Sequence, residues 1–141
     1  MPNSNITAGI IFLTIPTVAY GGYFLLSIIK KSGIGQFATN APFAGRMFRA
    51  GHAHAGTWLI LSVAAIPFIE RVGLSNLTKS LLLYGFPFAA LFISGGFFAS
   101  ALPINPEQNK PGPGIALVYI GAAILTISCF ILAWGLLSLP K

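Results

Sequence analysis

Both histidines of the chain lie in one short segment, residues 46–58, which opens a long apolar run. His52 and His54 are the side chains best suited to bind a metal, and two cations, Arg46 and Arg49, precede them. Small residues on either side of His54 would let something flat and bulky, or another helix, approach the backbone closely. This segment is therefore the candidate site of the protein, and it suggests a cofactor.

Helical geometry separates the two imidazoles. At 100° per residue, His52 and His54 point about 200° apart, so they cannot both bind one metal ion from the same chain. Trp58 lies one turn after His54 on the same face. An ionisable residue in a membrane span is by default a functional-site hypothesis, and the alternative is a neutral histidine that hydrogen-bonds between helices. From geometry alone, both interpretations stay open.

The rest of the sequence limits the chemistry of these histidines. A zinc site needs three or four ligands, whereas Cys129, Glu70 and Glu107 all lie far from the histidines in the sequence. Haem needs only one protein ligand on its iron, together with cations for its propionates and apolar or aromatic walls. The residues of this chain match haem better than zinc.

Composition predicts a membrane protein. Hydrophobic residues make up 55% of the chain and charged residues 7%, and the mean hydropathy is +0.83; in soluble domains about a quarter of the residues are charged. Apolar runs predict transmembrane helices at about 6–29, 45–69, 77–102 and 115–139. The first run has neither a basic segment before it nor a cleavage site behind it, so we expect a retained helix and not a signal peptide. The predicted fold class is all-α, an integral membrane antiparallel four-transmembrane-helix bundle formed by one domain, 1–141.

The formal net charge of +6 fits basic loop ends of a membrane protein, and no basic patch with interleaved aromatics predicts a nucleic-acid partner. We expect contact with a lipid bilayer and a multi-pass protein of the cell membrane, namely a bacterial inner membrane. The positive-inside rule favours both termini outside, and without Arg46 and Arg49 the count is equal. The cations expected on one side are Lys30, Lys31, Arg46, Arg49 and Lys110, and those on the other are Arg71, Lys79 and Lys141.

The third predicted helix combines phenylalanines with the pair Gly95-Gly96. That mixture suits a planar apolar ligand, and it equally suits helix packing through small residues. The stretch 103–114 that follows contains four prolines and two glycines, which predict an ordered, stiff loop and not a helix.

Three short motifs follow one another along the chain. They are Arg49 with His54-Ala55-Gly56, then Gly96-Phe97-Phe98 at the end of the third predicted helix, and Gly112-Pro113-Gly114 before the fourth. In order and spacing, residues 46–135 resemble the styrene oxide isomerase family. Members of that family are small four-helix membrane enzymes that carry haem b on a histidine of the second helix, assemble as trimers with haem at the subunit boundaries, and are regarded as related in fold to part of the haem-copper oxidase core.

The resemblance implies that His54 is the axial ligand of haem b and that the opposite face of the iron is left for substrate. In that family, ferric haem acts as a Lewis acid that binds an epoxide oxygen while the ring opens and a hydride shift gives an aldehyde. We therefore expect isomerisation of a small aryl epoxide by a homo-oligomer, a trimer by resemblance. The expected cofactor-binding residues are His54, which is also the metal ligand, His52, Arg46, Arg49, Trp58, Phe97, Phe98 and Lys110, with Arg46, Arg49 or Lys110 near the propionates.

Two positions depart from the family. Where the isomerase orients its substrate with an asparagine and a tyrosine, this chain has Ile60 and Phe98, which cannot hydrogen-bond through their side chains. His52 is additional, and it could support the ligand or bind haem from a neighbouring subunit. The alternative function is therefore a non-enzymatic haem protein, in electron transfer, in gas sensing or as an accessory subunit of a respiratory complex. A third possibility is a structural four-helix protein without a cofactor.

Overall fold

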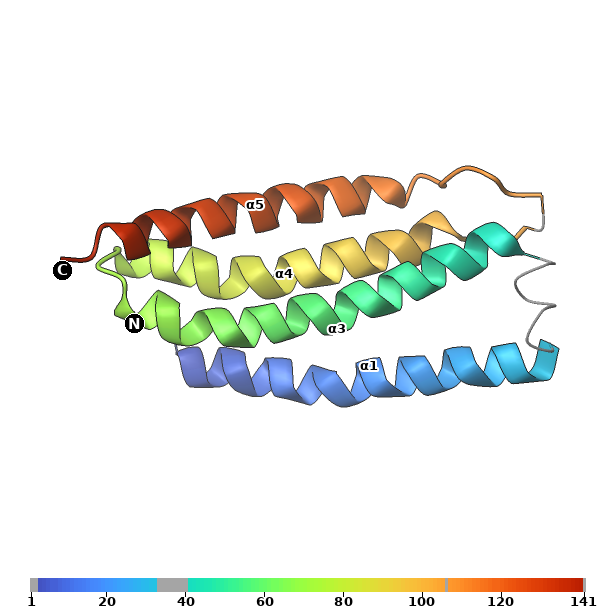
Figure 1. Ribbon diagram of the computed structural model, residues 1–141, viewed down its shortest axis with the longest axis horizontal. Coiled ribbons are helices and arrows are strands. Elements are labelled where there is room, and N and C mark those ends of the chain that lie inside the picture. The colour runs from blue at the N-terminus through green and yellow to red at the C-terminus, as the bar shows by residue number, and fades with distance from the viewer. Residues whose placement is uncertain (1–2, 33–40, 106, 141) are drawn as a thin grey trace.

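The computed structural model describes residues 3–32, 41–105 and 107–140. These residues form four long helices and no strand: α1 (Ser4–Ser32), α3 (Pro42–Arg71), α4 (Asn76–Ser100) and α5 (Ile115–Leu137). Successive helices run in opposite directions, which makes an antiparallel four-helix bundle (Figure 1). Each helix is long and apolar enough to cross a membrane. The predicted fold class is therefore confirmed, and the chain is a multi-pass membrane protein.

Local chemistry sets where the helices begin and end. Pro42 occupies the first turn of α3, where its missing N–H leaves no bond unmade, so this helix starts earlier than the predicted 45. Ser75 caps α4 by accepting a hydrogen bond from the backbone N–H of Thr78 at 3.2 Å. Each of the first three helices also contains an internal proline, which neighbouring helices in a membrane tolerate.

Helix α4 is the centre of the bundle. It packs along both α3 and α5, whereas α1 packs mainly on α3 and touches α4 only lightly. The core lies where α3 and α4 meet and includes Ile69, Leu82, Leu83 and Phe86, all buried. Helix α1 is the most exposed of the four, with many large apolar side chains on its surface. In a bilayer these side chains contact lipid.

Small residues at every seventh position lie where α5 packs on α4 and, at Gly135, on Val72 and Leu74 in the connection before α4. We name this set the heptad stripe, and its members are Gly114, Gly121, Ser128 and Gly135. A Cβ added at Gly121 would lie 2.8 Å from the backbone nitrogen of Ile93, and one added at Gly114 would lie 2.5 Å from the carbonyl carbon of Ala99. The backbones of the two helices therefore approach as closely as small residues allow.

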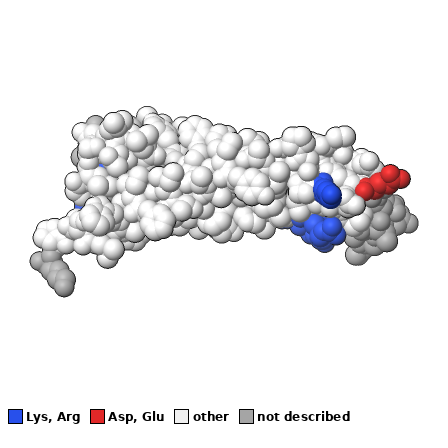
Figure 2. All heavy atoms as spheres, turned by 90° about the horizontal axis from the view of Figure 1, so that it is seen from above, with Lys and Arg blue, Asp and Glu red and all other residues white. Residues whose placement is uncertain are grey.

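The two ends of the bundle carry the charges, and the face seen in Figure 2 has none along its middle. At the end with both termini, Ser4 donates a hydrogen bond to the carboxylate of Glu70, and Lys79 Nζ donates to the Glu70 carbonyl oxygen at 2.9 Å. These bonds tie α1, α3 and α4 together. The opposite end carries Lys30, Arg46, Arg49 and Lys110. This is the division expected from the sequence; the side chain of Lys31 and all of Lys141 lie outside the described residues.

The loop between α4 and α5 is ordered by hydrogen bonds, as its prolines predict. Its anchor is the carbonyl oxygen of Ser100, which accepts from the N–H of Gly112 at 2.7 Å and from Gln108 Nε2 at 3.0 Å. Gln108 Nε2 also donates to the carbonyl of Lys110 at 3.1 Å. The loop thus folds back onto the end of α4 and delivers the chain to α5.

Candidate functional site

The imidazole of His54 is held by its own helix. Its Nδ1 lies 2.7 Å from the carbonyl oxygen of Ala50, one turn earlier. Because a carbonyl oxygen can only accept, this contact selects the neutral tautomer that has its proton on Nδ1 and a lone pair on Nε2. Nε2 has no hydrogen-bond partner within the described ranges, and it is not among the buried unpaired atoms, so it reaches the protein surface. A histidine that ligates a metal is usually prepared in this way.

Two aromatic side chains flank this imidazole. The ring centroid of His54 lies 4.9 Å from that of Phe97 on α4 and 6.1 Å from that of Trp58 on α3. The Nε1 of Trp58 is buried and has no partner in the described structure. A buried N–H without an acceptor is destabilising, so this donor would gain from an acceptor on a bound molecule. The structure therefore brings together three of the predicted site residues: His54, Trp58 and Phe97.

The face of α3 that carries His54 continues along a shallow groove toward the other end of the bundle. Leu61 and Ala65 lie seven and eleven residues after His54, hence nearly in line with it on a helix. Both line an apolar groove of about 240 Å³ between α3 and α5. His54 thus stands on the α5 side of the contact between α3 and α4.

His52 points toward a different helix. A Cβ added at Gly22 of α1 would lie 2.9 Å from Nε2 of His52, and one added at Gly21 would lie 3.9 Å from Nδ1. The His52 ring therefore packs on the glycine pair of α1, while His54 packs against α4. Nowhere in the described parts of the chain do three or more His, Cys, Asp or Glu side chains gather in a way that could hold a metal ion.

The predicted propionate partners lie at the loop end of the bundle. Arg46, Arg49 and Lys110 are exposed, and the Arg46 guanidinium stacks 5.9 Å from the ring centroid of Phe43. Arg46 precedes His54 by eight residues, or about 12 Å along the helix axis. These cations lie at the end of the bundle nearer His54, and no hydrogen bond joins them to His54 within the described residues.

Phe98 and Ile60 both lie away from the His54 ring. The Phe98 ring packs on α3, where a Cβ at Gly51 would meet it at 3.1 Å, and its centroid lies 5.8 Å from that of Phe48. Ile60 is 69% exposed on the outer surface of the bundle. Neither side chain takes the place of the family's substrate-orienting groups beside the histidine.

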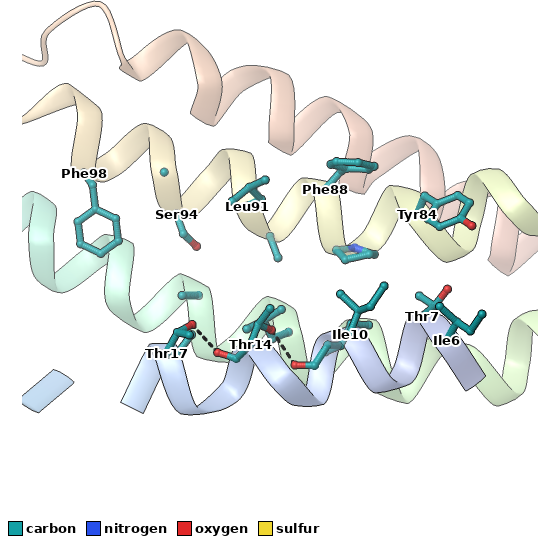
Figure 3. Close-up of a pocket in the computed structure, with 17 residues that line it drawn as sticks. Ile6, Thr7, Ile10, Thr14, Thr17, Tyr84, Phe88, Leu91, Ser94 and Phe98 are labelled. Atoms are coloured by element: carbon teal, nitrogen blue, oxygen red, sulfur yellow. Dashed lines mark hydrogen bonds between the residues drawn. The ribbon is translucent and has the colours of Figure 1, made fainter. Parts of the chain in front are cut away.

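A second hollow, which sequence reasoning missed, lies between α1, α3 and α4 (Figure 3). We name it the α1 cavity; its volume is about 590 Å³. Within it, Gly95 faces open space, whereas its neighbour Gly96 packs against the backbone of Val118 on α5. Gly96 therefore serves helix packing, as one interpretation of the sequence predicts, whereas Gly95 leaves space in the cavity. The lining residues are Ile6, Thr7, Ile10, Ile11, Thr14, Thr17, Val18, Ala55, Leu59, Tyr84, Pro87, Phe88, Ala90, Leu91, Ser94, Gly95 and Phe98.

Comparisons of the chain with protein-family models, with curated proteins and with solved structures find no match. The resemblance to styrene oxide isomerases therefore rests on the three short motifs, and any functional argument rests on the chemistry of the residues described above.

Proposed function

We propose that this protein is a membrane-embedded haem b protein of the styrene oxide isomerase type, with His54 as the axial ligand. The observation that carries the proposal is the hydrogen bond from His54 Nδ1 to the Ala50 carbonyl, because it fixes the ring and leaves Nε2 as a lone-pair donor. Haem is the metal group that suits a site with a single protein ligand, since the rest of its iron coordination comes from the porphyrin.

The surroundings of His54 fit a flat apolar cofactor. Phe97 and Trp58 provide aromatic walls on two helices, and an apolar groove begins at Leu61, two turns further along α3. The unpaired Nε1–H of Trp58 is a donor available to an oxygen of the cofactor or substrate. Arg46, two turns nearer the membrane surface, lies where the acidic edge of such a group would meet water.

In the enzymatic form of the proposal, a small aryl epoxide rearranges to an aldehyde with no gain or loss of atoms. Bound ferric haem would supply a Lewis-acidic iron for the epoxide oxygen. The chain would hold the imidazole in one tautomer through Ala50, and its aromatic walls would exclude water. Exclusion of water matters because water would capture a developing cation and give a diol.

A second candidate is a haem protein without enzymatic activity, in electron transfer, gas sensing or a respiratory complex. The placement of Ile60 and Phe98 favours it, because neither side chain can orient a substrate by a hydrogen bond and neither faces His54. Both candidates share the same ligand and differ in whether bound haem would keep a coordination position of its iron free for a substrate.

The absorption spectrum of the detergent-purified protein tests the shared part. We expect a Soret band in the wild type, its loss in His54→Ala, and its retention in the matched control His52→Ala, whose ring packs on α1. A wild type without the band after expression with ample haem would exclude the proposal. A band that survives in full in His54→Ala would exclude His54 as the ligand.

Spin state and product analysis separate the two candidates. Five-coordinate high-spin iron, with conversion of styrene oxide to phenylacetaldehyde, would identify the isomerase. Six-coordinate low-spin iron without that product would identify the non-enzymatic protein.

The proposal includes assembly as a homo-oligomer, a trimer by resemblance, in a bacterial inner membrane. The groove between α3 and α5 is open on its outer side, so a neighbouring subunit could cover it. The mass of the protein in native nanodiscs tests the oligomeric state, and membrane fractionation of the source cells tests the location.

A further inference from the structure

The α1 cavity is long and narrow. Its lining runs from Ile6 to Val18 on α1, which is about 18 Å along the helix, and from Tyr84 to Phe98 on α4, which is about 21 Å. Its volume of about 590 Å³ lies within the range of ordinary ligand sites and far exceeds that of a small aryl epoxide. The length and volume of the cavity suit an extended hydrocarbon chain.

One buried polar group in this apolar lining lacks a partner. Ser94 is 6% exposed, and its Oγ is buried without a hydrogen bond in the described structure. Figure 3 shows its hydroxyl pointing from α4 toward α1. Across the cavity, the hydroxyls of Thr14 and Thr17 donate to the carbonyls of Ile11 and Thr14, at 2.7 and 2.6 Å. Those threonines are satisfied by their own helix, whereas Ser94 is not.

The position of Ser94 defines where a ligand would need its polar atom. Ser94 lies four residues from Phe98 and ten from Tyr84, so it divides the cavity into lengths of about 6 Å and 15 Å. A ligand that enters the cavity from the bilayer can bring an acceptor oxygen at little cost in free energy, because Ser94 can donate to it. A ligand that brought a hydrogen-bond donor would bury that donor without a partner, which would oppose binding. An acceptor near one end of a long chain therefore matches both the shape and the hydroxyl.

We propose that the α1 cavity binds an extended hydrocarbon chain that carries one carbonyl oxygen near its end, and that Ser94 donates the hydrogen bond to that oxygen. This carbonyl oxygen could belong to the ester of a membrane lipid or to a free long-chain ketone or ester. This site is separate from the proposed haem site, because the lining of the cavity includes none of His54, Trp58 and Phe97.

Binding can be measured with the full-length protein in nanodiscs of one saturated ether lipid, which has no ester carbonyl to compete, with empty nanodiscs as the blank. The probes are radiolabelled methyl tridecyl ketone and pentadecane, which differ only in the carbonyl. We expect the wild type to bind the ketone about fivefold more tightly than the alkane, the typical effect of one net hydrogen bond. Equal binding of both probes, or binding of neither, would overturn the proposal.

Three variants test which residues produce this preference for the ketone. Ser94→Ala should bind both probes equally, and its melting temperature should match or exceed that of the wild type, because it removes an unpaired hydroxyl. Ser62→Ala is the matched control: this buried serine of α3 donates to the Trp58 carbonyl at 2.7 Å outside the cavity, so the fivefold preference should persist. Gly95→Leu should weaken both probes, since a side chain there extends into open space. A preference that survives in Ser94→Ala would overturn the role of Ser94.

Mass spectrometry of lipids extracted from the purified protein identifies the source. An ester lipid retained by the wild type and lost from Gly95→Leu would assign the ligand to the bilayer. Ketone preference without any retained lipid would assign it to a free long-chain compound. The Soret band should be equal in the wild type and Ser94→Ala, so failure of this proposal is distinguishable from failure of the proposed haem site.

Discussion

The ring of His52 rests on Gly22 of α1, so closely that a Cβ at this glycine would lie 2.9 Å from Nε2. Few residues join α1 to the rest of the bundle, and this contact is one of the points where it meets α3. The additional histidine of the sequence therefore has a structural role at the boundary of α1 and α3, whatever else it does.

Adding a methyl group at position 22 tests this contact. Gly22→Ala should lower the free energy of unfolding by about 1 kcal/mol in detergent, because the His52 ring must shift. In a His52→Ala background the same change should have no cost, since the ring is gone. Gly9→Ala is the control on the same helix, where a Cβ meets nothing within 4 Å. Additive effects of Gly22→Ala and His52→Ala would contradict the contact.

The heptad stripe predicts that an added methyl group on α5 lowers the free energy of unfolding more than Gly22→Ala does on α1. Gly121→Ala would place its Cβ 2.8 Å from the backbone nitrogen of Ile93 and 3.0 Å from the carbonyl oxygen of Ala89, and backbone atoms cannot move aside without separating the helices. We expect a loss of about 1–3 kcal/mol in unfolding free energy. Ala122→Leu, next to it on the exposed side, adds more volume and should be nearly neutral. If the two variants unfold alike, the stripe is not the packing surface.

Removal of the unpaired indole donor gives a third test. Trp58→Phe keeps an aromatic ring beside His54 and deletes the buried Nε1–H, so the haem-free protein should gain up to about 1 kcal/mol of stability. Trp58→Ala should instead lose about 3–5 kcal/mol, because it leaves a cavity. Thermal unfolding of haem-free protein distinguishes them, and an equal loss in both would show that the indole N–H is satisfied.

Cysteine labelling tests the arrangement in the bilayer. In a Cys129→Ala background, Lys110→Cys and Lys79→Cys should react with an impermeant maleimide from opposite sides of the membrane. The positive-inside rule puts Lys79 outside, so only Lys79→Cys should be labelled in intact cells. Labelling of Lys110→Cys alone in intact cells would reverse the predicted orientation but would still agree with the four-helix bundle. Labelling of both variants from one side would contradict the four membrane spans.

Much of the fold follows from the sequence because long apolar runs can satisfy their backbone in lipid only as helices. The four predicted spans agree with the structure to within a few residues, and the largest difference at a described start is α3, which begins at Pro42. The opposed directions of His52 and His54 also follow from helical geometry. Which helix each ring meets could not be predicted, because α1 and α4 are apolar around most of their surface and hydropathy gives little sign of which face packs on α3.

The α1 cavity illustrates what pattern reasoning misses. A serine in an apolar helix usually donates to a carbonyl of its own preceding turn, as Ser62 does, so Ser94 gives no signal in the sequence. Only coordinates show that its hydroxyl has no partner among the described residues. The heptad stripe, by contrast, was visible as small residues at positions 114, 121, 128 and 135, and a search for a period of seven would have found it.

The heptad stripe also determines how freely α5 can change. Four small positions carry its close contacts, three with α4 and one, Gly135, with the connection before α4, while most other side chains of α5 face outward and need only be apolar. In a saturation-mutagenesis map, α5 should therefore show narrow bands of intolerance one heptad apart, separated by positions that accept most hydrophobic residues. Divergent versions of this helix could share almost no identity and still dock in the same register.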